Sequence, residues 1–456
     1  MKDSTKAILI ATILTFIVFF EVDSIAITIP SISRSFNLDS ITTIWISIAY
    51  LLTCAGTGLL FGKIIPKNGL LKTTKVCLIM VLIGTILASI GTNPYIIIIG
   101  KGIEGLAAGG LGSALYLFVI NYVDTSKIGR GLGISTSGGF LGALLAPIIA
   151  GAFTYYLSWR FVMGFTIPFT IVALILVFDL KEEIRLKVKF KRLSAFTWFI
   201  AMFLFGYGLS FLTTTLGIIS LVTGLIILAV FIYFELKNPN PIYNFRLLKN
   251  KEYFINNYNA CISVIVKTGF IFVLTLYLNY VRLLSSVEIG LIIGFIEGIM
   301  IVLCIYTGKL CDTHNTIKIS NYGLFIIAIT ALILCFSNSM STFLILVILT
   351  ILSIGFTLLE VSNKKIIIDI SDKEDLPQAT SFLSSIRDIG AMLPPVILTL
   401  VLSVFDNISG FQIEYWSISS QWMFIIFFIL SATMFIASMY LNKDLSRKYD
   451  SNTYSK

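Results

Sequence analysis

The sequence predicts an all-α protein that crosses a membrane many times, and three observations carry this prediction. Of its 456 residues, 57% are hydrophobic and only 12% are charged, and the mean hydropathy is +0.94. Apolar runs of about 20 residues recur along the chain, each long enough to cross a hydrocarbon layer of roughly 30 Å. Lys and Arg are concentrated between these runs. A soluble globular protein does not combine these features.

Fourteen membrane-spanning helices are expected from the apolar runs. The first eight cover about 7–31, 42–64, 73–92, 95–122, 131–155, 159–180, 194–215 and 217–236. The last six cover about 255–281, 287–308, 318–336, 341–361, 378–404 and 421–441. A backbone inside lipid must satisfy its own hydrogen bonds, so each run is expected to be helical even where it contains glycine or proline.

The distribution of charge supports this count and gives an orientation. If the N-terminus is cytoplasmic, the inward loops are 63–75, 123–130, 181–192, 237–253, 309–318 and 362–376. These loops hold nearly all the Lys and Arg, whereas the outward loops hold only Arg34, Arg160 and Arg282. The positive-inside rule therefore predicts a multi-pass protein of the cell membrane with both termini in the cytoplasm. The net charge of +9 follows from this topology, so no nucleic-acid partner is expected.

The chain divides into two halves of similar size. We expect a six-helix bundle at 1–180, a basic linker with two extra helices at 181–253, a second six-helix bundle at 254–442 and a cytoplasmic tail at 443–456. Gly62-Lys63 follows the second helix, and the same dipeptide, Gly308-Lys309, follows the tenth. The two halves therefore share a short internal repeat. Two related halves are typical of secondary transporters, in which one half rocks against the other.

The fifth predicted helix contains the stretch GISTSGGFLGALLAPIIAG, from Gly133 to Gly151. Small residues at 138, 142, 146 and 150 repeat every four positions, which allows a second helix to approach closely along one face. Pro147 removes one backbone hydrogen bond and can bend the helix. Two interpretations remain open. The helix is either a tightly packed structural element or one whose close contact shifts during transport.

Several charged residues fall inside the predicted spans. Each costs roughly 2.5–3.5 kcal/mol at bilayer depth on insertion scales, so it should face the bundle interior or a water-filled cavity. Lys101 and Glu104 are three residues apart, on one helical face, and can pair. The set comprises Glu21, Asp23, Lys101, Glu104, Lys267 and Glu297.

A carboxyl group held out of water but near a cation can bind a proton on one side of a membrane and release it on the other. We expect Glu21 and Glu297 to be the leading sites for a proton or a cationic substrate. Asp23, Glu104 and Lys101 are the second choices. For each residue, the alternative is a structural ion pair or a position nearer the membrane surface.

Other chemistry has no support in the sequence. No phosphate-binding Walker loop is present, so ATP is not the expected energy source. No Ser/His/Asp or Cys/His set indicates an enzyme, and no cysteine pair has metal-ligand spacing, so neither a metal nor a cofactor is expected. A membrane receptor or an integral-membrane enzyme remains an alternative from another class.

Three helices carry motifs that resemble the major facilitator superfamily, and specifically its fourteen-helix drug:proton antiporters of the multidrug and tetracycline type. The first helix has an acidic motif from Glu21 to Pro30. The fourth has Lys101-Gly-Ile-Glu104-Gly105, similar to the family's Arg-x-x-Gln-Gly. In the fifth, Gly133, Gly142, Pro147 and Gly151 resemble the antiporter motif.

The loop after the second helix resembles the signature cytoplasmic loop of the superfamily. Gly62, Lys67 and Gly69 match it, whereas Pro66 stands where the family has Asp. The second copy of this loop, with Gly308 and Asp312, keeps the acidic residue. The resemblance implies that these loops take part in the conformational change.

The resemblance implies the major facilitator fold, with two six-helix bundles and two additional central helices. It also implies a monomeric transporter that exports lipophilic or cationic compounds, including antibiotics, by proton antiport with alternating access. The proton gradient would supply the energy. A transporter of the same fold that moves a metabolite, a lipid or a siderophore remains the closest alternative.

Overall fold

A computed structural model describes residues 2–38, 40–181, 191–212, 214–238, 240–405 and 412–453. These ranges form helices and connecting turns, with no strand among them. The first eight helices are α1 Asp3–Phe36, α2 Ser40–Gly58, α3 Phe61–Asn68, α4 Leu70–Ile90, α5 Pro94–Tyr122, α6 Ile128–Tyr156, α7 Trp159–Met163 and α8 Ile167–Phe178. The others are α9 Arg192–Ser210, α10 Thr215–Lys237, α11 Lys251–Tyr280, α12 Ser286–Thr313, α13 Thr316–Leu334, α14 Thr342–Ile370, α15 Leu376–Phe405 and α16 Gln412–Thr453.

The expected number of membrane spans agrees with the structure. Among the described residues, 13 helical segments are long and apolar enough to cross a bilayer, and a bent pair raises the number to 14. This pair is α2 and α3, which meet at 63°. Between them, Leu60 N donates to Thr57 O at 2.9 Å and Gly62 N donates to Leu59 O at 3.2 Å. Both hydrogen bonds join residues three apart, as in a 3-10 helix, and tighten the turn. The predicted helix 42–64 is therefore broken rather than continuous.

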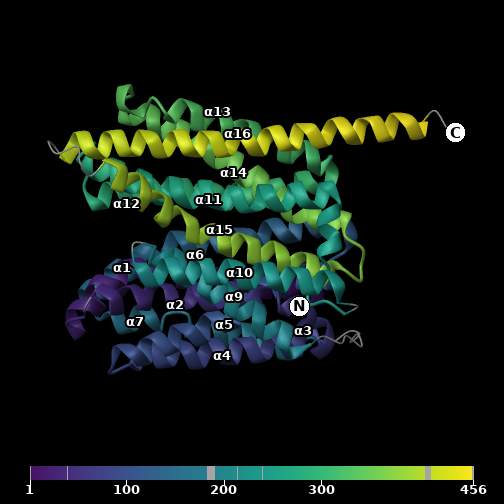
Figure 1. The fold of residues 1–456 in the computed structure, drawn as a ribbon, viewed down its shortest axis with the longest axis horizontal. Coiled ribbons are helices and arrows are strands. Elements are labelled where there is room, and N and C mark those ends of the chain that lie inside the picture. Colours follow the sequence, from purple (N-terminus) through teal and green to yellow (C-terminus); the bar gives the residue numbers. More distant parts are fainter. Residues whose placement is uncertain are drawn as a thin grey trace.

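Figure 1 shows the helices as roughly parallel rods. Of the first group, α1 to α8, the labelled helices lie in the lower part of the view; of the second group, α11 to α16, most lie in the upper part, and α15 runs obliquely between the groups. The main contacts between the two groups are α6 with α12 and α2 with α15. Helix α9 packs on both α2 and α15, and α10 packs mainly on α9. The additional helix pair therefore covers the seam between the groups on one side. The exact domain boundaries remain a prediction.

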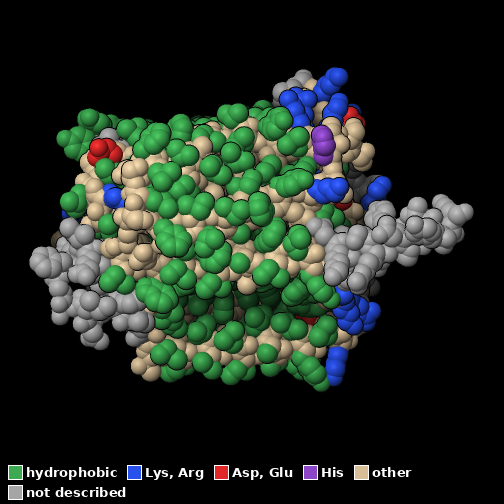
Figure 2. Space-filling view, turned by 90° about the horizontal axis from the view of Figure 1, so that it is seen from above, with side chains coloured by type: hydrophobic (Ala, Val, Ile, Leu, Met, Phe, Trp, Pro, Cys, Tyr) green, Lys and Arg blue, Asp and Glu red, His purple; other side chains and the backbone are tan. Residues whose placement is uncertain are grey.

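The charged residues are segregated along the helix direction. Most Lys and Arg side chains on the face in Figure 2 lie at one end, and hydrophobic side chains cover the length between the ends. The N-terminus and the C-terminal end of α16 lie toward that same end (Figure 1). This distribution matches a chain that spans a membrane an even number of times, with its basic loops on one side.

The structure bears differently on two of the predicted inward loops, 362–376 and 181–192. The interval 362–376 was expected to be an inward loop, but α14 continues to Ile370, so most of it is helical. The reason is that Lys364 is 5% exposed and bonded inside the protein, so this lysine does not mark a membrane surface. The basic stretch 181–192 falls largely outside the described residues.

Candidate functional site

Three groups of charged side chains lie within the bundle, and the first and third are largely buried. The first joins α1 and α5, where Lys101 Nζ lies 2.5 Å from Glu21 Oε2 and 2.8 Å from Glu104 Oε2. The expected pairing of Lys101 with Glu104 is thus present, and Glu21 joins it. All three side chains are at most 2% exposed. We call these residues the Glu21–Lys101–Glu104 cluster.

The cluster contains two carboxyl groups but only one ammonium group. Thr166 Oγ1 donates a hydrogen bond of 2.5 Å to Glu21 Oε1, so both oxygens of Glu21 have partners. Glu104 Oε1 has no hydrogen-bond partner among the described residues. If every group is ionised, the cluster carries one net negative charge in a low-dielectric interior, which is costly. A single bound proton makes the cluster neutral.

Glycines allow the helices to approach closely at this cluster. A Cβ atom at Gly84 of α4 would meet Glu104 Cγ at 2.7 Å, so the Glu104 side chain lies directly on the α4 backbone. A Cβ atom at Gly105 would meet Tyr50 O of α2 at 2.2 Å. Gly84 of the third predicted span and Gly105 of the fourth therefore serve helix packing, and this packing removes water from Glu104.

The second ionic group lies between the two halves. Lys267 Nζ of α11 is 3.8 Å from Glu297 Oε1 of α12, and it lies 4.0 Å from the ring centroid of Phe140 on α6. Asp23 of α1 has an exposed surface and lies near enough for the charges of Glu297 and Lys267 to act on it. Glu297 is 2% exposed, and its Oε2 has no partner in the described part of the chain. Two acids and one lysine thus repeat the charge balance of the first cluster.

The third ionic group was missed by the sequence analysis. Glu360 of α14 accepts hydrogen bonds from Arg387 Nη2 of α15 at 2.6 and 2.7 Å, and it lies 2.8 Å from Lys364 Nζ. Lys364 Nζ also donates to Thr136 Oγ1 of α6 at 2.9 Å, across the interface between the halves. The spacing of Glu360 and Lys364 by four residues was a usable signal, but Lys364 had been placed in a loop.

The glycine-rich helix α6 uses its small residues in two directions. A Cβ atom at Gly138 would meet Thr12 O at 2.4 Å, and one at Gly142 would meet Phe16 O at 2.6 Å, both on α1. A Cβ atom at Gly133 would meet Cys304 O of α12 at 2.3 Å. The predicted close approach along 138 and 142 is therefore made by α1, within the first half, whereas Gly133 contacts the second half.

Two other residues of this motif behave differently. Apart from the helix's own backbone and the two chain neighbours, no heavy atom of the described residues lies within 4 Å of a Cβ atom placed at Gly151, so this glycine is not needed for helix packing in this conformation. Helix α6 continues through Pro147 without a break. The assignment of a transport role to these two residues stays a prediction.

The second copy of the repeated loop joins the halves. Asp312, at the end of α12, accepts hydrogen bonds from Gly129 N at 2.7 Å and from Arg130 N at 2.8 Å. These are free N–H groups in the first turn of α6, where a carboxylate is favourable. A Cβ atom at Gly308 would meet Gly129 O at 2.4 Å and Arg130 Cα at 3.1 Å. Asp312 therefore caps a helix of the other half.

The first copy meets α15 in the same way but without an acid. A Cβ atom at Gly62 would meet Pro377 O at 3.2 Å and Gln378 Cα at 3.0 Å. Pro377 and Gln378 thus occupy the places that Gly129 and Arg130 hold in the other contact. Pro66 replaces the acid, and Pro377 has no N–H group to be capped.

Gly69 and Lys67 complete the first copy. Gly69 has a φ of 95°, in the region that side chains disfavour, so it permits the turn between α3 and α4. Lys67 is exposed in the last turn of α3.

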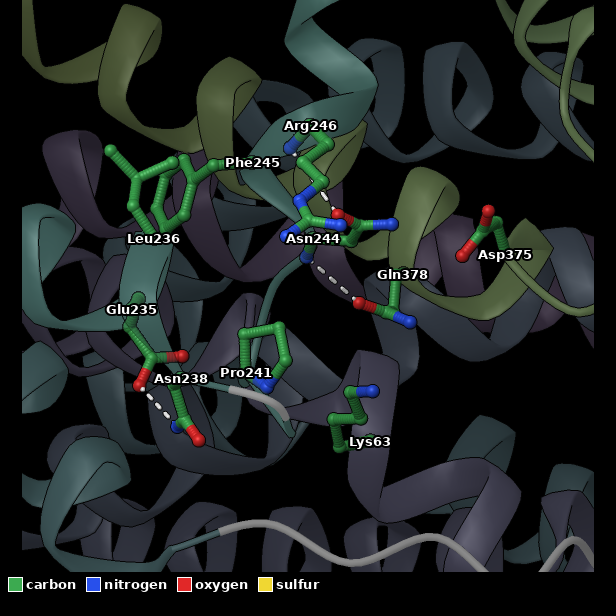
Figure 3. Close-up of a pocket in the computed structure, with 10 residues that line it drawn as sticks. All are labelled: Lys63, Glu235, Leu236, Asn238, Pro241, Asn244, Phe245, Arg246, Asp375 and Gln378. Atoms are coloured by element: carbon green, nitrogen blue, oxygen red, sulfur yellow. Dashed lines mark hydrogen bonds between the residues drawn. The ribbon is translucent and has the colours of Figure 1, made fainter.

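A polar pocket of about 370 Å³ lies beside this contact. Figure 3 shows Lys63 of α3, Glu235 of α10 and Asp375 before α15 around it. Asn244 N donates to Gln378 Oε1 at 3.0 Å, which ties the segment after α10 to α15. Burial, then the charge of Asp372, raises the pKa of Asp375, whereas Lys63 lowers it. The pocket belongs to the contact between the halves rather than to the buried ionic groups.

Comparison with known proteins places this geometry in context. A sequence profile of the Major Facilitator Superfamily matches residues 11–363 and, in a second match, 259–454. The riboflavin transporter RibZ of Clostridioides difficile is 22% identical over 406 residues, covering 86% of this chain and 87% of RibZ. The lincomycin resistance protein LmrB of Listeria monocytogenes is 21% identical over 409 residues, covering 85% and 84%.

The fold is also found among solved structures. The human organic anion transporter MFSD10 superposes with a TM-score of 0.70 at 12% identity, covering 95% of this chain and 98% of MFSD10. At this identity the likeness concerns the fold alone. Proteins of this fold are generally membrane transporters and not enzymes. The profile match over most of the chain, together with the fold, shows that the chain belongs to the Major Facilitator Superfamily of membrane transporters.

Proposed function

We propose that the protein exports lipophilic or cationic compounds across the cell membrane in exchange for protons, with both termini in the cytoplasm. The observation that carries this proposal is the Glu21–Lys101–Glu104 cluster, in which two buried carboxyl groups share one ammonium group. Because one proton makes the cluster neutral, loading and release of that proton change the charge of the bundle interior. Resistance relatives such as LmrB support drug export.

The second ionic group supports a cationic substrate. The Asp23 side chain keeps an exposed surface while its neighbours Glu297 and Lys267 are largely enclosed, so the group is not sealed inside the protein. With all groups ionised, it carries one net negative charge, which attracts a cation. Phe140 beside Lys267 offers an aromatic surface to an apolar compound. The proton gradient is the proposed energy source, a single chain is the proposed working unit, and no cofactor is invoked.

Glu21→Gln is expected to reduce proton-driven export to near background at normal expression. The amide can still accept from Lys101 or Thr166, and Lys101 keeps its pair with Glu104, so the fold should persist. The variant cluster is already neutral and no longer needs a proton. The measurement is efflux of ethidium from energised vesicles, with collapse by a protonophore as the reference. Unchanged efflux in this variant would remove Glu21 from the coupling role.

Glu297→Gln is expected to weaken export of cations more than export of neutral compounds. Losing one charge contact of about 1.4 kcal/mol lowers affinity about tenfold. Lys267 and Asp23 remain to hold the local structure. The measurement is the resistance of an expressing strain to matched charged and uncharged toxic compounds. Full resistance to every cation would contradict a substrate role for Glu297.

A second candidate function is the transport of a metabolite by the same fold. The relationship to RibZ over most of both chains favours it. Radiolabelled riboflavin uptake and export in vesicles would separate the two candidates, since a drug exporter moves ethidium but not riboflavin. A receptor or an enzyme would show no energy-dependent movement of either compound.

A further inference from the structure

Tyr50 on α2 carries a buried hydroxyl group that no interaction accounts for. The residue is 4% exposed, and its hydroxyl has no hydrogen-bond partner among the described residues. A buried polar group without a partner costs about 1–3 kcal/mol, and most native structures avoid this cost. Phenylalanine would fill the same space without the cost, so the hydroxyl itself needs an explanation.

The ring lies between the first ionic cluster and the interface of the two halves. It packs with Cys54 and Ala108, next to Val18 and Val22, which flank Glu21 on α1. Three acids lie near enough for their charges to act on the hydroxyl: Glu21 of α1, Glu104 of α5 and Asp388 of α15. Two of these acids belong to the first half and one to the second half.

Asp388 is reached from the same face of α2. Cys54 lies one helical turn after Tyr50, and its thiol donates to Asp388 Oδ2 at 3.5 Å. The neighbouring Arg387 directs its guanidinium group to Glu360 instead. Among the described residues, Asp388 has no cation within ion-pair distance. It is therefore a half-buried carboxyl group at the α2–α15 contact, with a weak thiol partner.

We propose that the Tyr50 hydroxyl relays a proton between Glu104 in the Glu21–Lys101–Glu104 cluster and Asp388, an inference that rests on the proton-coupled function proposed above. The protonated Glu104 carboxyl gives its proton to the phenol oxygen while the phenol O–H proton passes to the Asp388 carboxylate. The negative charge thus moves from Asp388 to Glu104, and Tyr50 is unchanged.

The relay is tied to the movement of the two halves. No carboxyl group of the described residues lies within hydrogen-bond distance of the Tyr50 hydroxyl in this conformation. Since α2 and α15 belong to different halves, their relative position changes when the halves rock. The transfer therefore takes place in another step of the cycle. In the conformation described here, the hydroxyl is not yet in contact with the two carboxyl groups.

The test compares Tyr50→Phe with the unmodified protein in reconstituted vesicles, using ethidium and a pH-sensitive dye. Tyr50→Phe is expected to lose most proton-driven ethidium transport and substrate-induced proton movement, while ethidium exchange at equal pH stays within about twofold. Asp388→Asn is expected to show the same pattern. Thermal stability of Tyr50→Phe should be unchanged or higher, because no hydrogen bond is lost.

A matched control is Tyr277→Phe on α11, which removes a buried hydroxyl that donates to Ser337 O at 3.1 Å, far along the chain from these acids. It should lower stability but leave proton coupling intact. Normal proton-driven transport by Tyr50→Phe would overturn the relay while leaving the antiport proposal standing. If the unmodified protein moves ethidium without protons, the antiport proposal and the relay fall together.

Discussion

Replacing Lys101 by methionine should strongly destabilise the protein and abolish transport. The ammonium group is the shared partner of Glu21 and Glu104, at 2.5 and 2.8 Å, and all three side chains are buried. Removing one partner of a buried ion pair leaves uncompensated charge and typically costs about 3–5 kcal/mol. The measurement is the thermal unfolding of the purified protein, together with ethidium efflux at matched expression.

Two further variants distinguish charge from shape in this prediction. Lys101→Arg keeps the positive charge, although the guanidinium group does not release a proton, so it should preserve most of the stability and less of the transport. Lys101→Met combined with Glu21→Gln and Glu104→Gln removes all three charges and should recover part of the lost stability. A stable, active Lys101→Met protein would show that the cluster neither holds the helices nor takes part in coupling.

Gly133→Ala should have the second large effect, and Gly151→Ala is its matched control from the same motif. A methyl group at 133 would approach Cys304 O of α12 to 2.3 Å, so the two halves must separate locally. Overpacking of this kind costs about 1–3 kcal/mol, and here it falls on the contact that must form and break during transport. At 151, the corresponding position meets no heavy atom of another element in the described part of the chain within 4 Å, so the control should transport normally.

Ethidium efflux and thermal stability of both glycine variants decide this prediction. We expect transport by Gly133→Ala to fall about tenfold or more, which corresponds to at least 1.4 kcal/mol in the affected step. Equal activity of the two variants would indicate that the α6–α12 contact does not limit the cycle. A loss in Gly151→Ala alone would point to a contact made in another conformation.

The sequence predicts the helices well because their apolar runs are long and the bilayer constrains them. It also predicts Lys101 with Glu104, since both residues lie on one helix. The partnership of Glu21 with that pair depends on how α1 packs against α5, which no local pattern encodes. Glu360 and Arg387 were missed for the same reason. Both residues lie inside predicted spans, 341–361 and 378–404, so their burial was open to prediction. Their contact joins α14 to α15 and depends on how those two helices pack.

The sequence also does not predict which backbone groups face the two copies of the repeated loop. The sequence shows that Pro66 departs from the family pattern, but it does not show which residue Pro66's loop contacts. Only the structure shows that Pro377 stands opposite Gly62, in the place that Gly129 takes opposite Gly308. The loss of an acid in one copy is matched there by the absence of an N–H group.

This pair of prolines makes the two contacts at the repeated loops unequal in strength. At the α6–α12 edge, Asp312 must release two backbone N–H groups before the halves part. Hydrogen bonds to charged groups contribute roughly 1.5–3 kcal/mol each. At the α3–α15 edge, Pro66 stands in place of the acid, so this contact has no counterpart of Asp312. The two halves should therefore separate first between α3 and α15, while the α6–α12 contact persists and acts as the hinge.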